Sequence, residues 1–162
     1  MNYYLSLGSN IGDRYGYLQR AIVKISEIGK IIKISSIYET SPVGVKDPQD
    51  MYLNMVISVS SEIYPDDMLE ILKRIEKKIG RDITDSHLKP RKIDIDILFC
   101  DEMIINKDNL VIPHKEVEKR KFVLIPLSEI DPELINPLSG NSVKEMLKHC
   151  KDNGYVRLVK KI

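Results

Sequence analysis

The segment at residues 93–99 constrains the fold more than any other part of the sequence, because isoleucine and aspartate alternate along it before a short apolar run. Such alternation is typical of a β-strand with one buried face. Side chains two positions apart point to the same side of a strand, so Asp94 and Asp96 share a face and lie roughly 6–7 Å apart. The segment therefore predicts a strand that brings two carboxylates together.

Two neighbouring carboxylates repel each other unless a cation lies between them, and hard oxygen ligands at this spacing suit Mg²⁺. Arg91, just upstream, has a fork-shaped donor group that suits phosphate. Carboxylates for a metal beside an arginine for phosphate are what phosphoryl transfer requires. Acidic residues also alternate on the solvent face of antiparallel strands, where they only keep the strand soluble. An isolated Asp-x-Asp favours that second interpretation, so the rest of the chain has to decide.

Length and composition indicate an ordinary globular protein. The chain has 162 residues, of which 43% are hydrophobic and 30% charged, and we expect a single domain over residues 1–162. A net charge of +1 argues against a nucleic-acid or membrane surface held by bulk charge. Two cysteines, Cys100 and Cys150, predict reduced thiols. Neither a signal peptide nor an apolar run of about 20 residues is evident in the sequence, so we expect a cytoplasmic protein.

Hydrophobic periodicity predicts the order strand, helix, strand, strand, helix, strand. The predicted elements are a strand at 3–7, a helix from Asp13 to a stop at Gly29, strands at 30–38 and 52–59, a helix from Pro65 to a stop at Gly80, and the strand at 93–99. This order predicts an α+β fold of the ferredoxin-like, split βαβ type. Its antiparallel sheet carries the helices on one face and leaves the other face free for a site. A C-terminal appendage follows, with a helix at 142–149 and a strand at 155–159.

Two long loops interrupt the pattern, at residues 40–50 and 81–91. Loops of this length inside a compact domain often cover a site. A glycine-containing turn at 8–14 either exposes backbone N–H groups to a ligand or simply connects strand to helix, with Asn10 or Asp13 as the cap.

Three polar positions stand out on the predicted elements. Tyr52 and Asn54 share one strand face, where a ring beside a carboxamide suits a flat, hydrogen-bonding heterocycle. Taken alone, the pair favours the simpler interpretation of a tyrosine packed at a sheet edge beside a surface asparagine. Glu76 falls inside the apolar arc of its helix and needs a partner, for which Arg81 and Arg91 are candidates.

Five motifs occur in order along the chain: LGSNIGD at 7–13, SPVG at 41–44, YLN at 52–54, PRKIDIDIL at 90–98 and IPH at 112–114. Together they closely resemble the 6-hydroxymethyl-7,8-dihydropterin pyrophosphokinases of folate biosynthesis, and the resemblance covers residues 4–127. The Pro-Arg-x-x-Asp-x-Asp element is its most specific part. With several motifs in register, the metal-binding interpretation of Asp94 and Asp96 outweighs the solvent-face interpretation.

The resemblance implies an enzyme that transfers the terminal pyrophosphoryl group of ATP to the pterin's hydroxymethyl oxygen, leaving AMP. It implies two Mg²⁺ ions on Asp94 and Asp96, mobile loops at 43–50 and 82–89, and a monomer that binds ATP and the pterin but neither nucleic acid nor membrane. The implied catalytic residues are Arg81, Arg91, Asp94 and Asp96. The implied pterin-binding residues are Thr40, Pro42, Val43, Tyr52, Asn54 and Phe122. The implied ATP-binding residues are Glu76, Arg81, Arg91, Ile97, Asn109, Val111, His114 and Arg120.

Four residues depart from the family pattern, namely Ile83, Leu88, Lys89 and Lys115. They bear on ATP affinity and loop closure more than on the reaction type. The main alternative function is a ligand-sensing domain that binds a metabolite without consuming ATP, since the same sheet serves such domains. A different nucleotidyl or phosphoryl transferase is the closest enzymatic alternative. An RNA-binding module fits less well, because the predicted sheet lacks an exposed aromatic set.

Overall fold

The computed structural model describes residues 1–42, 50–80 and 91–162. The strands of the main sheet are β1 (Asn2–Ser9), β2 (Lys30–Ile34), β3 (Ile37–Thr40), β4 (Tyr52–Ser60), β5 (Asp94–Cys100) and β8 (Val156–Lys160). A separate hairpin consists of β6 (Ile105–Asn106) and β7 (Val111–Ile112). The helices are α1 (Arg14–Ser26), α2 (Pro65–Ile79), α3 (Lys121–Ile130) and α4 (Val143–His149), with a 3-10 turn at Val117–Lys119. The predicted loops fall largely within 43–49 and 81–90, outside the described residues.

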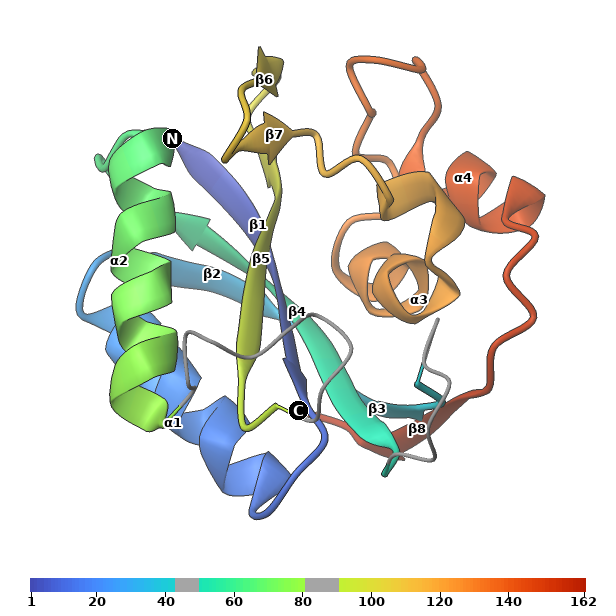
Figure 1. Ribbon diagram of the computed structural model, residues 1–162. Coiled ribbons are helices and arrows are strands. Elements are labelled where there is room, and N and C mark those ends of the chain that lie inside the picture. The colour runs from blue at the N-terminus through green and yellow to red at the C-terminus, as the bar shows by residue number, and fades with distance from the viewer. Residues whose placement is uncertain (43–49, 81–90) are drawn as a thin grey trace.

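The described strands form a six-stranded sheet in the order β5-β1-β4-β3-β8, with β2 also paired to β4 (Figure 1). Every pairing in it is antiparallel. The predicted α+β, ferredoxin-like class is confirmed, because the central strands β5, β1 and β4 neighbour one another as the split βαβ order requires. β5, which carries the aspartates, lies at one edge of the sheet beside β1.

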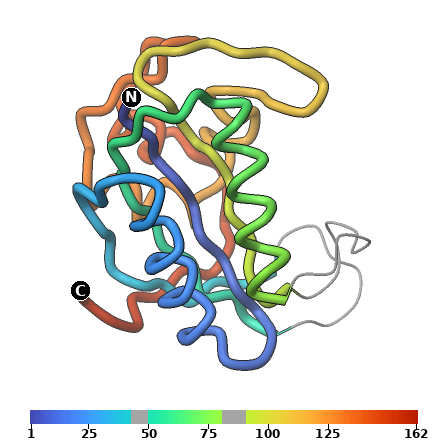
Figure 2. The backbone as a smooth tube through the Cα atoms, turned by 90° about the vertical axis from the view of Figure 1, so that its left-hand side faces the viewer, coloured from blue at the N-terminus to red at the C-terminus, as the bar shows by residue number. Residues whose placement is uncertain are grey.

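The helices α1 and α2 pack on one face of this sheet, the face nearest the viewer in Figure 2. As predicted, the side chain of Asp13 caps α1 by accepting a hydrogen bond from the Gly16 N–H at 3.0 Å. Pro65 begins α2, and Gly80 ends it with a left-handed φ of 108°, which a side chain would strain. Their apolar stripes include Leu18, Ala21, Ile25, Met68, Leu72 and Ile75, all buried against the sheet.

The opposite face is not left entirely free, because α3 and α4 cover part of it (Figure 1). Val56 and Leu98 point from the sheet into a second core with Val123, Leu124 and Leu127 of α3. The physical reason lies in β5 itself, whose alternation gives way to a continuous apolar run. Such a run is buried on both faces, so the second half of the strand needs a cover that the first half lacks.

The strand predicted at 30–38 is divided into β2 and β3 by two buried serines. The Ser35 hydroxyl accepts a hydrogen bond from the Val56 N–H at 2.9 Å, which interrupts regular pairing. The N–H and hydroxyl of Ser36 donate to the carboxylate of Glu129 on α3, at 3.0 and 2.7 Å. The break therefore ties the sheet to α3.

The C-terminal appendage has the predicted helix and strand, and the strand joins the main sheet. β8 pairs with β3 and so becomes the edge opposite β5. Cys100 and Cys150 are both free, as predicted. None of the helices in the described ranges is long and apolar enough to cross a membrane.

Candidate active site

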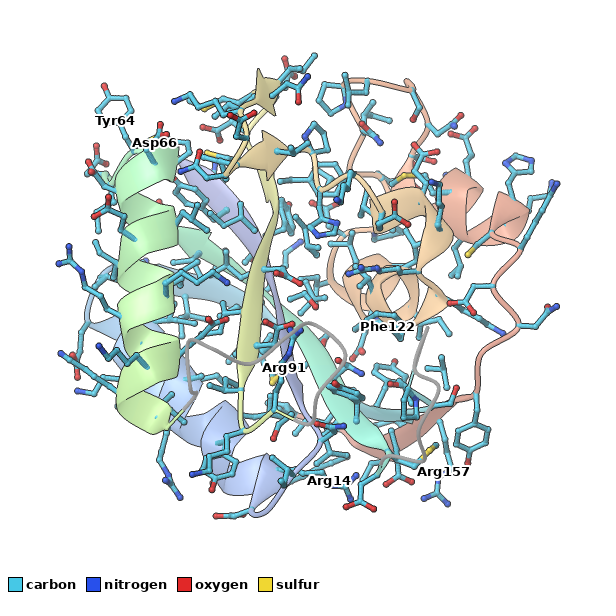
Figure 3. The ribbon with its side chains drawn as sticks, viewed as in Figure 1. Arg14, Tyr64, Asp66, Arg91, Phe122 and Arg157 are labelled. Carbon is cyan, nitrogen blue, oxygen red and sulfur yellow. The ribbon has the colours of Figure 1, made fainter. Side chains whose placement is uncertain are left out.

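A pocket of about 310 Å³ opens on the α3 side of the sheet, over the part that the second core leaves uncovered. Strands β1, β4 and β5 contribute its floor, and the end of β3, the segment after β7 and the start of α3 contribute its walls. Figure 3 shows Phe122 at the start of α3, across from Arg91 on the segment that leads into β5. The residues that line it are Ser6, Gly8, Thr40, Ser41, Tyr52, Asn54, Arg91, Asp94, Asp96, His114, Lys115, Arg120 and Phe122.

Asp94 and Asp96 both line the pocket from β5, and the isoleucines between and beside them are buried on the other face. Their partners across the ladder on β1 are small, since Gly8 pairs with Asp94 and Ser6 pairs with Asp96. A Cβ at Gly8 would lie 2.7 Å from Oδ1 of Asn54, closer than such atoms approach. The glycine on β1 therefore lets the amide of Asn54 lie close to the strand on the pocket side.

The electrostatics of the pair favour a bound cation. Burial, reinforced by the negative charge of Asp94, raises the pKa of Asp96, and the positive charges of His114, Lys73 and Arg120 offset this only in part. Burial also lowers the pKa of His114, although the nearby Asp96 acts in the opposite direction. The protein alone thus holds ionised Asp96 at an energetic cost, which a divalent cation would remove.

Arg91 holds a fixed position beside the carboxylates. Its side chain is only 4% exposed, and Nη1 donates to Oδ2 of Asp94 at 2.6 Å. The Nε–H group is buried and has no acceptor among the residues that the structure describes. An unsatisfied buried donor costs about 1–3 kcal/mol, so a ligand oxygen that accepted from it would be favoured.

The turn after β1 positions the backbone of Arg91. The N–H of Asn10 donates to the Arg91 carbonyl at 3.0 Å, and Oδ1 of Asn10 accepts from the Arg91 N–H at 2.7 Å. Asn10 is buried, and its Nδ2 also reaches the Asp50 carbonyl at 3.4 Å. Of the two interpretations of this turn, the connection capped by Asp13 is confirmed, while Asn10 links the turn to the segment that carries Arg91.

Two aromatic rings, Tyr52 and Phe122, also line the pocket. Asn54 lies on β4 with Tyr52, and its Nδ2 donates to the hydroxyl of Thr40 on β3 at 2.6 Å, which fixes the amide plane. The Arg120 guanidinium lies 5.8 Å from the centre of the Phe122 ring and restricts it further. Two rings and an oriented amide are suited to a flat heterocycle with a polar edge.

Several predicted site residues are not brought to the pocket wall. Pro42 is described but does not line it. Ile97 lies one position beyond Asp96 and is buried, and Asn109 and Val111 belong to the turn and second strand of the β6–β7 hairpin. The predicted residues that lie outside the described ranges are Val43, Arg81, Ile83, Leu88 and Lys89.

The helical pattern placed Glu76 on the apolar side of its helix but did not indicate the partners that the structure shows. Glu76 is 1% exposed, and its Oε1 accepts a hydrogen bond from the Ile95 N–H at 2.7 Å. Lys73, one turn earlier on α2, lies 3.3 Å from its other oxygen. Arg91, the described candidate partner, pairs with Asp94 instead. Glu76 thus supports the outer side of β5 between the two aspartates.

Sequence reasoning did not select Ser6, Gly8 and Ser41 as lining residues, and it noted Lys115 only as a departure. A signal for the first two was present, because both are small and Gly8 directly follows the strand predicted at 3–7, two positions after Ser6. Lys73, whose charge acts on Asp96, carried no such signal on an exposed helix face.

Comparisons with known proteins identify the family of the chain. The family model described as 7,8-dihydro-6-hydroxymethylpterin-pyrophosphokinase (HPPK) matches residues 4–132. The chain is 40% identical over 144 residues to the 2-amino-4-hydroxy-6-hydroxymethyldihydropteridine pyrophosphokinase of Aquifex aeolicus, covering 88% of each chain. It is 40% identical over 129 residues to the enzyme of that name in Bacillus subtilis, covering 78% of this chain and 76% of the relative.

A solved structure of Plasmodium falciparum HPPK-DHPS with pteroate shares the fold, with a TM-score of 0.73 at 19% identity. The match covers 91% of this chain but only 42% of that longer chain. From the family match and the identities to its relatives, the chain belongs to the 7,8-dihydro-6-hydroxymethylpterin-pyrophosphokinase family.

Proposed function

We propose that the pocket is the active site of a pyrophosphokinase of folate biosynthesis. The enzyme transfers the terminal pyrophosphoryl group of ATP to the hydroxymethyl group of 6-hydroxymethyl-7,8-dihydropterin and releases AMP. Family membership supplies the reaction. The observation that carries the assignment to this pocket is that two carboxylates, a buried arginine and an aromatic pair line the same 310 Å³ space.

The residues present fit Mg²⁺. Asp94 and Asp96 offer hard oxygen ligands, and desolvation together with the charge of Asp94 raises the pKa of Asp96, so that a cation would favour its ionised form. In the described part of the chain, no group of three or more carboxylate, imidazole or thiol side chains is arranged to hold a metal ion by itself. A site with two carboxylates suits Mg²⁺, which usually takes its other ligands from water and substrate phosphates. When bound, Mg²⁺ neutralises phosphate oxygens, and we propose two such ions.

The basic residues around the carboxylates would bind the triphosphate. Arg91 is fixed by Asn10 and Asp94, and its Nε–H lacks an acceptor among the described residues. His114 and Arg120 line the same wall. Arginine donors stabilise the charge that develops during phosphoryl transfer, which assigns a catalytic role to Arg91. The remaining proposed ATP-binding residues are Glu76, Arg81, Ile97, Asn109 and Val111.

The pterin would lie between Tyr52 and Phe122, with Asn54 and the segment from Thr40 to Val43 at its polar edge. A hydroxymethyl group is a weak nucleophile, and the dominant requirement is alignment for in-line attack on the β-phosphorus. The amide of Asn54, which Thr40 holds in place, would help to orient the pterin for this attack, and no dedicated general base is proposed. We also propose that residues 1–162 form a single domain and that the protein is a cytoplasmic monomer.

Product analysis tests the proposed function. The protein is incubated with ATP, Mg²⁺ and 6-hydroxymethyl-7,8-dihydropterin, and the nucleotides and pterins are separated by chromatography. Formation of AMP and the pterin pyrophosphate in equal amounts supports the proposal. Formation of ADP, or of inorganic pyrophosphate, would indicate a different transferase, and pterin binding without turnover would indicate a ligand-sensing domain.

A further inference from the structure

Helix α3 begins without a cap from its own sequence. Arg120 occupies the capping position, and its side chain makes no capping hydrogen bond. The N–H of Lys121 instead donates to Oδ2 of Asp152 at 2.9 Å, and Asp152 lies in the segment that follows α4. A carboxylate at this place satisfies an otherwise unpaired N–H and interacts favourably with the positive end of the helix dipole.

The same C-terminal segment contacts the opposite side of the pocket. The other oxygen of Asp152 accepts from the Gly154 N–H at 2.8 Å, which fixes the chain as it turns toward β8. The Tyr155 N–H then donates to the Ser41 hydroxyl at 3.1 Å, and the Ser41 N–H donates to the Tyr155 carbonyl at 3.1 Å. We call residues 150–156 the C-terminal strap.

The strap therefore joins two residues that line the pocket from different elements. Phe122 follows Lys121 in the first turn of α3, and Ser41 follows the end of β3. Asp152 does not itself line the pocket, so any influence on a ligand passes through these two neighbours. We infer that Asp152 is a positioning residue for pterin binding, because it sets the separation between the Phe122 wall and the Ser41 wall. This inference rests on the proposed function.

The rest of α3 is held independently of Asp152. Val123, Leu124 and Leu127 are buried in the second core. Glu129, near the other end of the helix, accepts hydrogen bonds from the backbone N–H and hydroxyl of Ser36. Loss of the Asp152 carboxylate would consequently loosen the first turn, with Phe122, and leave the remainder of the helix in place.

The test compares Asp152→Ala, Asp152→Asn and the control Glu133→Ala. Glu133 is 68% exposed and pairs only at the surface with Lys144, at 2.6 Å, so its removal deletes an acid from the same half of the molecule without touching the strap. For each protein, 6-hydroxymethyl-7,8-dihydropterin is titrated in the presence of Mg²⁺ and a non-hydrolysable ATP analogue. The affinity for the ATP analogue, the KM for each substrate, kcat and the Tm are measured as well.

We expect Asp152→Ala to weaken pterin binding roughly five- to tenfold, which corresponds to the loss of a helix cap. The KM for the pterin rises with it, while the affinity for the ATP analogue falls by clearly less, since among the proposed ATP ligands only Arg120 adjoins the loosened turn. Asp152→Asn keeps one acceptor oxygen, so its pterin affinity is expected to lie between that of Asp152→Ala and that of the unaltered protein. If Asp152→Ala is unfolded at the assay temperature, Asp152→Asn decides by the same criterion.

If the unaltered protein binds the pterin and the Asp152 variants bind it equally well, this inference is overturned and the proposed function stands. An equal loss of pterin and ATP-analogue affinity, or the same loss in Glu133→Ala, would also overturn it by indicating general destabilisation. Failure of the unaltered protein to bind the pterin at all would overturn the proposed function as well.

Discussion

Asn10 and Arg91, 81 positions apart in sequence, are joined by two hydrogen bonds in which each residue both donates and accepts. The pair connects the turn after β1 with the segment that enters β5. It fixes the arginine's backbone three residues before Asp94, while the side chain of Arg91 is held by Asp94 itself. The glycine-containing turn thus contributes to the site by supporting Arg91.

Replacement of Asn10 by alanine is expected to reduce both stability and activity. The variant leaves the buried N–H of Arg91 without its acceptor, which costs about 1–3 kcal/mol of unfolding free energy. Turnover falls further than stability explains, because Arg91 is no longer fixed beside the carboxylates. Urea denaturation and steady-state kinetics measure the two effects, with exposed Asn2→Ala as the matched control. Equal behaviour of the two variants would refute the supporting role of Asn10.

Replacement of Asp96 by asparagine is expected to separate activity from stability. The variant loses a proposed Mg²⁺ ligand, so turnover falls roughly 10²–10³-fold. Without Mg²⁺ the same variant is expected to unfold at higher denaturant concentration than the unaltered protein, because the substitution removes a carboxylate whose charged form is disfavoured by desolvation and by the charge of Asp94. Near-normal activity at saturating Mg²⁺ would mean that the metal role of Asp96 is wrong.

The stability difference between these two proteins should depend on pH. The pKa of Asp96 is raised above its ordinary value of 3.8, so the folded state binds this proton more tightly than the unfolded state. Below pH 3.8 the carboxyl group of Asp96 is protonated in both the folded and the unfolded state, so it does not lower the free energy of unfolding. As the pH rises from there through the raised pKa, the unaltered protein loses stability relative to Asp96→Asn, and the difference then stays constant. Denaturation in metal-free buffer from pH 3.5 to 8 measures it, and a difference that shrinks with rising pH would contradict the account.

Replacement of Tyr52 or Phe122 by alanine is expected to weaken pterin binding by roughly 1–3 kcal/mol, the usual value of an aromatic face stacked on a heterocycle. ATP-analogue affinity changes less, since neither ring is a proposed ligand of the triphosphate or of Mg²⁺. Fluorescence or calorimetric titration of each ligand measures the two affinities. A matching loss of affinity for both ligands would argue against a pterin held between the two rings.

Much of this fold follows from local patterns in the sequence. Helix starts at Asp13 and Pro65 and the stop at Gly80 are confirmed, because caps and glycine conformations depend on a few adjacent residues. The cover that α3 and α4 place on the second face was not predicted. The sequence signal for this cover was the continuous apolar run after Asp96 on β5. A strand with one solvent-exposed face would have kept alternating, so the run indicated burial on both faces.

The parts of the site that sequence reasoning missed depend on long-range contacts. Nothing near Asn10 in the sequence indicates that it binds the backbone of Arg91, and nothing near Lys121 indicates that its N–H reaches Asp152, 31 residues later. Periodicity and motifs describe neighbours along the chain. Hydrogen bonds between distant segments are set by tertiary packing, and only the folded structure places them.

The central claim is that Asp94 and Asp96 bind Mg²⁺ together with the phosphates of ATP. Its most direct test is calorimetric titration of a non-hydrolysable ATP analogue into the unaltered protein and into Asp96→Asn, each with and without Mg²⁺. The account predicts that Mg²⁺ strengthens binding of the analogue to the unaltered protein and has little effect on the variant. An equal Mg²⁺-dependent gain in both proteins would contradict it.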